Sequence, residues 1–533
     1  MKQSSGKPPE TAAGSIDVPE SPGRVVEVVR VRELLCVVTG MCVADIAVFR
    51  GGGFAGWAIL LLAFPILLHI GSPAGRPLRS TWLFTTALVF LCARLAWLGS
   101  PLTVCCGLGL LCIFALGRAG RTVQVLESFA FAWCVIPSGI LGLVPYWKQF
   151  QYLAPRISPK WLNVLLPLCA LFLFSFLFIG ANPDLVQTVS DKLARWIDQL
   201  EQWLIHTSPV EIVFLCFVAI VTVGLLRPVS ALQELRDRDT REHLPLNVTS
   251  FLYTPCRNTM VTVVILFAIY LSFEFQTLWF REFPVGFYYS GYAHQGAAWL
   301  TVALMLATGI LSLIFQGDLL ADPRRGRLYL LAWIWSLENL ILGMAVLNRL
   351  FIYIQFNGMT RMRIIGLFGI ATVIAGFVLV IVKIIQTRSF LWLLRAHLMT
   401  LAAACYLYCL TPVDWFSTTY NVRRIMSGDL APAVQLSVHP LNPEGLSQVI
   451  PLTDHPEQTI AAGIRSLLAN AYLRYEPSAG QSLSDTWSDY QLSHQWLRGH
   501  LHAHRAKWQD HYRDQTRRDV DLQRFADFVY QWY

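Results

Sequence analysis

Long apolar runs follow one another from residue 33 to residue 411, and they constrain the fold more than any other feature of the chain. Each run is close to the roughly 20 residues that cross a bilayer as a helix. Charged residues make up only 14% of the chain, against about 25% in an ordinary soluble domain. Twelve runs can be delimited, at 33–50, 53–71, 81–98, 101–117, 124–146, 161–180, 209–226, 258–280, 294–315, 328–350, 362–386 and 390–411.

These runs are too long and too uniformly apolar for the strands of a membrane barrel, and backbone groups inside lipid must bond to one another. The sequence therefore predicts an all-α fold, a polytopic transmembrane helix bundle of 11 or 12 spans whose main partner is the lipid bilayer. The charge deficit excludes a disordered chain and a basic domain that binds nucleic acid. We expect no cofactor and no metal site, since no cluster of cysteine and histidine has ligand spacing.

Basic residues set the predicted orientation, because Arg and Lys favour cytoplasmic loops. The loops at 227–243, 316–327 and 387–389 carry such residues, so we place them and the N-terminus inside a bacterial cytoplasmic membrane and the tail outside it. An amphipathic helix is expected over 183–206, along the outer interface. Three parts follow: a disordered cytoplasmic extension over 1–32, a transmembrane domain over 33–411, and a small soluble extracytoplasmic helical domain over 412–533.

The run at 124–146 conflicts with this orientation. The loops on its two sides, 118–123 and 147–160, both carry basic residues, and one spanning helix cannot have both ends on the same side. We expect the segment to be broken near Pro137 and to re-enter the side from which it came. A full span beside a loop that violates the charge rule is the alternative.

Ionisable side chains inside a span are expensive to bury, so each is a candidate for function. Glu338 lies in the middle of the run at 328–350. It could carry a proton or pair with an arginine, or a hydrogen bond between helices could account for it. Arg94 and Glu274 lie near the ends of their runs, where long side chains can reach the interface.

An arginine-rich segment at 347–363 joins two spans on the predicted outer face, against the inside bias of basic residues. Arg361 and Arg363 begin a helix, where the helix dipole disfavours a cation. Arginine binds carboxylate and phosphate through two parallel hydrogen bonds. We therefore predict an anion site, whose partner is a lipid phosphate, a solute or acidic side chains such as Asp414. A structural ion-pair cluster that holds the tail to the spans is the other interpretation, and it is the favoured one because charge clusters of this kind are often structural.

An aromatic loop at 280–296 is expected on the same face, as an interfacial belt or as the lip of a binding site. With the arginine segment and the mid-span carboxylate it completes the set of candidate residues. The predicted ligand-binding residues are Arg349, Arg361, Arg363, Tyr353, Asn348, Glu338, Tyr292 and Gln276.

Several short motifs resemble those of a bacterial family of polytopic membrane proteins known as domains of unknown function forty-one fifty-three and forty-one seventy-three. The resemblance extends over about 30–500 and supports the segments at 276–296 and 348–363 as shared features; it implies no activity, cofactor or partner. The motifs are Gly-Ala-Asn-Pro-Asp at 180–184, Gln-Thr-Leu-Trp-Phe at 276–280, Tyr-Ala-His-Gln-Gly at 292–296, the segments 348–353, 358–363 and 420–437, and Trp-Ser-Asp-Tyr-Gln-Leu at 487–492.

Three functions fit these features. The favoured one is transport or flipping of an anionic solute or lipid, because of the outer arginines and Glu338. The second is a non-catalytic membrane sensor or assembly protein, because of the tail and the helix at 183–206. The third is a membrane transferase acting on lipid-linked substrates, for which no nucleophile or pair of carboxylates stands out. The sequence therefore favours a protein that is not an enzyme. A transporter should contain a polar cavity near the midplane, whereas an assembly protein should pair its arginines internally.

Overall fold

The computed structural model describes residues 31–72, 81–120, 124–153, 208–228, 252–276, most of 299–314, 322–386, 388–475 and 487–532. Every element in these ranges is a helix, which confirms the predicted all-α bundle. Eight of the described helices are long and apolar enough to cross a membrane, so the chain is a membrane protein. The expected amphipathic helix at 183–206, the whole aromatic loop at 280–296 and residues 1–30 of the N-terminal extension lie outside the described residues.

The first bundle consists of α1 (Val31–Ala44) with its π-helical continuation Asp45–Phe49, α2 (Phe54–Gly71), α3 (Thr81–Trp97), α4 (Pro101–Arg118) and α8 (Pro209–Leu226). Serine residues cap the N-termini of two of these helices. The side chain of Ser100 accepts a hydrogen bond from the amide of Thr103, and that of Ser208 accepts one from the amide of Val210. Apolar side chains such as Leu61 and Phe64 are buried between the helices.

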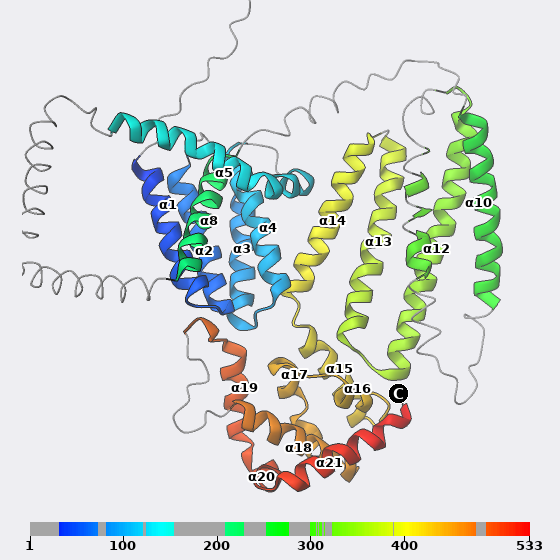
Figure 1. The fold of residues 1–533 in the computed structure, drawn as a ribbon. Helices are drawn as coiled ribbons and strands as arrows, with labels where there is room; N and C mark the ends of the chain where they lie inside the picture. Colours follow the sequence, from blue (N-terminus) through cyan, green and yellow to red (C-terminus); the bar gives the residue numbers. More distant parts are fainter. Residues whose placement is uncertain are drawn as a thin grey trace, which may run out of the picture.

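The second bundle consists of α10 (Tyr253–Glu274), α12 (Arg325–Asn357), α13 (Arg361–Gln386) and α14 (Phe390–Leu410). Its core includes Trp335, which is fully buried and meets the ring of Phe267 edge to face at 5.8 Å. Helix α14 packs against α13 and also touches α3, α4 and α5. It therefore lies between the two bundles (Figure 1).

Helix α5 (Val125–Leu153) is continuous through Pro137, so the predicted break is wrong. It lies across the ends of the neighbouring helices rather than alongside them (Figure 1). Glu127 near its start binds Arg395 near the start of α14, and Tyr146 near its other end donates a hydrogen bond of 2.6 Å to Glu33 at the start of α1. These two α5 residues are about 28 Å apart along the helix, yet both meet the same end of the bundles. The conflict between the basic loops disappears, because both ends of α5 lie at one side.

The C-terminal residues form a separate group of short helices at the opposite end of the bundles from α5 (Figure 1). Trp508, Tyr472 and Phe525 are fully buried in a core made only of residues from this group. We call it the C-terminal domain. Its helices are α15 (Val413–Met426), α16 (Ala433–Val438), α17 (Pro443–Gln448), α18 (Gln458–Tyr475), α19 (Leu492–Ala503), α20 (Gln509–Arg513) and α21 (Gln515–Val529).

Candidate functional site

Arg349 of α12 forms a buried ion pair with Glu274 of α10. Its Nε donates to Oε1 at 2.7 Å and its Nη2 donates to the other carboxylate oxygen. The side chains are 5% and 1% exposed, so water does not screen the pair. Two opposite charges buried together hold α10 against α12, and removal of either one would leave an uncompensated charge.

Arg361, the first residue of α13, binds both carboxylate oxygens of Asp414 in α15. It also donates to the carbonyl oxygen of Pro440 at 3.3 Å. Asp414 is buried and lies in the first turn of α15, where the helix dipole favours a negative charge. The cation that is disfavoured at the start of α13 therefore has its anion in the C-terminal domain.

Arg363 has no carboxylate partner among the described residues. Its side chain donates to the carbonyl oxygen of Gly358 and lies over the ring of Tyr353, 3.8 Å from the centroid. Gly358 has φ 86° and ψ −168°, a conformation open almost only to glycine. This turn between α12 and α13 is also held from α15, because Asn421 accepts from the amide of Met359 at 2.6 Å and donates to its carbonyl at 2.8 Å.

The remaining predicted residues do not join this cluster. Asn348 is half-buried in α12, and Gln276 is exposed just beyond α10. Glu338 lies about 16 Å along α12 from Arg349; its Oε2 is buried and has no hydrogen-bond partner among the described residues. Tyr292 lies outside the described part of the chain.

A second set of contacts joins the C-terminal domain to the first bundle. Glu444 of α17 accepts from Nη2 of Arg94 at 3.0 Å and from the indole Nε1 of Trp97 at 2.7 Å. The side chains of Arg94 and Glu444 are 14% and 3% exposed. Ser488 donates to the carbonyl of Gly51 and accepts from the amide of Gly53 at 3.3 Å. From its position near the end of an apolar run, Arg94 is expected to reach the membrane interface, and the structure instead pairs it with Glu444. Its place inside an apolar run is a signal of function, but a partner 350 residues away cannot be read from the sequence.

Further hydrogen bonds join the domain to the end of α12. Arg424 of α15 donates to the carbonyls of Ile354 at 2.9 Å and Gln355 at 2.5 Å. Asn357 donates to the carbonyl of Trp532 at 2.8 Å. The C-terminal domain is therefore bound to both bundles by polar contacts, several of them buried.

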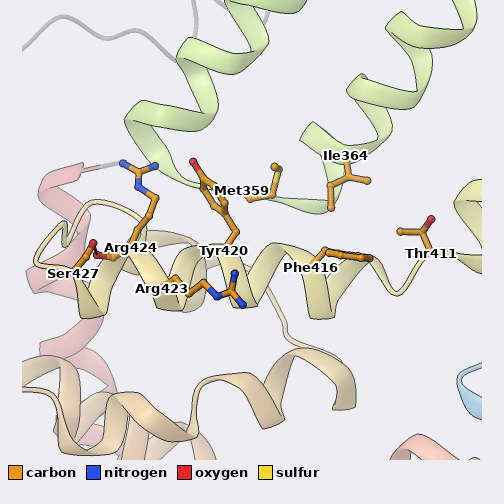
Figure 2. A pocket seen from close by; sticks show the side chains of 8 residues that line it. All are labelled: Met359, Ile364, Thr411, Phe416, Tyr420, Arg423, Arg424 and Ser427. Carbon is orange, nitrogen blue, oxygen red and sulfur yellow. Dashed lines mark hydrogen bonds between the residues drawn. The ribbon is translucent and has the colours of Figure 1, made fainter.

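Two cavities flank α15. One of about 240 Å³ includes Arg361, Asp414 and His439 in its lining. Burial, together with the charges of Arg363 and Arg361, lowers the pKa of His439, so its ring is neutral at pH 7. The other cavity, of about 600 Å³, lies between α15 and the ends of α13 and α14 and is mainly apolar (Figure 2).

Within the described residues, no three His, Cys, Asp or Glu side chains are grouped so that they could hold a metal ion. Several of the buried charged groups form pairs between helices, such as Arg349 with Glu274, Arg361 with Asp414 and Arg94 with Glu444. Such an arrangement can hold elements together and bind an anion at its edge.

A family model described as "Domain of unknown function (DUF4153)" matches residues 78–439. That range extends from the start of α3 to the end of α16, so it includes the arginine segment and the α15 contacts. No curated protein matches the chain, and no solved structure matches it.

Proposed function

The chain belongs to the DUF4153 family, whose description names no activity, and from its geometry we propose that it is a non-catalytic membrane assembly or sensor protein. In this role the C-terminal domain acts as a clamp, which joins the two bundles and sets their relative position. We further propose that the protein lies in a bacterial cytoplasmic membrane with this domain outside.

One observation carries the proposal: the predicted anion-binding arginines have partners inside the protein. Arg349 pairs with Glu274, Arg361 pairs with Asp414, and Arg363 binds the turn at Gly358. An arginine already bound to a carboxylate has few donors left for a passing solute. Charges placed between a domain and two bundles fix their geometry, and this supports the assembly role over transport.

Glu338 supports a second candidate, transport or flipping of an anionic solute or lipid. A carboxyl group inside a span with one oxygen buried and unpartnered in the described structure is costly. Such a group can carry a proton during transport. This observation is the reason to test transport directly.

The test uses the full chain reconstituted into vesicles that contain fluorescent phosphatidylglycerol. Dithionite added outside bleaches the outer leaflet only. We expect the protected inner fraction to equal that of vesicles without protein. A protein-dependent loss of protected probe that Glu338→Gln abolishes would overturn the assembly role and support lipid flipping. The variant Asp454→Asn, in the exposed pair with Lys507 of the C-terminal domain, serves as the matched control.

A further inference from the structure

The cavity of about 600 Å³ beside α15 has the features of a binding site that the clamp contacts do not use. It is lined by Met359 before α13, Ile364 in the first turn of α13, Thr411 after α14, and Phe416, Tyr420, Arg423, Arg424 and Ser427 from α15 and its end. Figure 2 shows Phe416 and Tyr420 on α15 near Met359 and Ile364. The cavity is open on one side.

The two arginines of the cavity differ in what they bind. Arg424 is held by the carbonyls of Ile354 and Gln355 and by Asp429. Arg423 is exposed, and no described carboxylate lies within ion-pair distance of it. The cavity therefore has one guanidinium held by the protein and one that is free to bind an anion through two parallel hydrogen bonds.

The apolar part of the cavity lies at the level where two of the apolar helices end. Helix α13 begins at Arg361 and α14 ends at Leu410, so Ile364 and Thr411 lie at the boundary between spans and C-terminal domain. Phe416 is 49% exposed, and Met362 nearby is 63% exposed. Aromatic side chains are enriched at this depth in a bilayer, which is also the depth of lipid phosphates.

We propose that this cavity binds one anionic phospholipid, with its phosphate against Arg423 and the upper part of an acyl chain against Ile364 and Phe416. A soluble anion would leave the apolar side chains of the cavity without a partner. An apolar peptide would leave the guanidinium of Arg423 without one. The choice of a lipid rests on this combination of charge and depth. It does not depend on whether the C-terminal domain acts as a clamp.

The test measures lipid binding to the full chain in detergent by native mass spectrometry, with phosphatidylglycerol and phosphatidylcholine as probes. We expect phosphatidylglycerol to bind more tightly and Arg423→Ala to weaken it about tenfold, as the loss of one charge-assisted pair implies. Arg423→Lys should restore part of the affinity, and Phe416→Ala should weaken both lipids. Arg513→Ala, which removes an exposed arginine elsewhere in the domain, is the matched control and should have no effect.

Three results would overturn the proposal. Equal affinity for the two lipids would remove the role of the anionic headgroup. An equal loss of affinity for phosphatidylglycerol in Arg423→Ala and Arg513→Ala would indicate a general attraction of the lipid to positive charge. Displacement of the lipid by millimolar glycerol phosphate would indicate a site for a soluble anion. Because Arg423 is exposed, unchanged melting of Arg423→Ala should accompany the loss of binding.

Discussion

Truncation of the carboxylate that joins the C-terminal domain to the first bundle should loosen that contact strongly. In Glu444→Ala, Arg94 loses both of its hydrogen bonds to the carboxylate and the indole of Trp97 loses its acceptor. The pair is nearly buried, at 14% and 3% side-chain exposure. Breaking a buried pair by removing one partner costs about 3 kcal/mol or more, which corresponds to roughly a 100-fold change in an opening equilibrium.

Hydrogen exchange of the peptide that contains Gly53 is the suitable assay, because that amide donates to Ser488 of the domain. Its exchange rate follows the opening equilibrium and should rise about 100-fold in Glu444→Ala. Arg94→Ala should have a similar effect. The change in the free energy of opening in the double variant should be about 2 kcal/mol smaller than the sum of the changes in the two single variants.

The control is Asp454→Ala, which also removes one acidic charge but breaks an exposed pair with Lys507. Exposed pairs contribute about 0–1 kcal/mol, so exchange at Gly53 should change by no more than a few-fold. Purely additive effects of Arg94→Ala and Glu444→Ala would refute the reasoning, since they would mean that the two side chains do not act as a pair.

Gly358→Ala should destabilise the protein by about 2 kcal/mol, because its φ of 86° is strained for alanine. Gly369→Ala, at a helical position with open space around it, should leave the melting temperature unchanged or raise it. Burial lowers the pKa of His494 and of His511, and at His511 this effect outweighs the carboxylate of Asp521, which raises the pKa. The free energy of unfolding should therefore stay constant above about pH 6.5, the unfolded pKa of histidine, and fall as the pH drops below that value. Replacement of both histidines by Gln should make the melting temperature less dependent on pH in this range. Finally, cysteines placed at the two ends of α5, in a chain without its own cysteines, should react with an impermeant thiol reagent from the same side of the membrane.

The apolar runs predicted the helices well, because helix formation inside lipid depends on local composition alone. The run at 390–411 corresponds to α14 (Phe390–Leu410), and the run at 209–226 corresponds to α8 (Pro209–Leu226). The distribution of basic residues also indicated that the two loops that flank 124–146 lie on the same side of the membrane. It did not reveal a helix lying across the bundle, since periodicity says nothing about the direction of a helix axis.

The arginine segment shows where sequence reasoning stops. Its arginines break the charge rule, which marks them as candidates, and Asp414, an acidic partner that the sequence suggests, does pair with Arg361. Which residue of a cluster is engaged and which is free depends on contacts between distant parts of the chain. Arg349 and Arg361 are paired with carboxylates, whereas Arg423, which no rule singled out, is exposed and has no described carboxylate within ion-pair distance.

The distance between the two bundles tests the clamp most directly. Spin labels at Leu108→Cys in α4 and Val378→Cys in α13, two exposed positions, would be measured by pulsed electron resonance in a background without other cysteines. We predict one narrow distance distribution in the otherwise intact chain and a broad one in Glu444→Ala. Two discrete distances in the intact chain, with populations that an anionic solute or lipid shifts, would contradict a fixed clamp and indicate alternating states of a transporter.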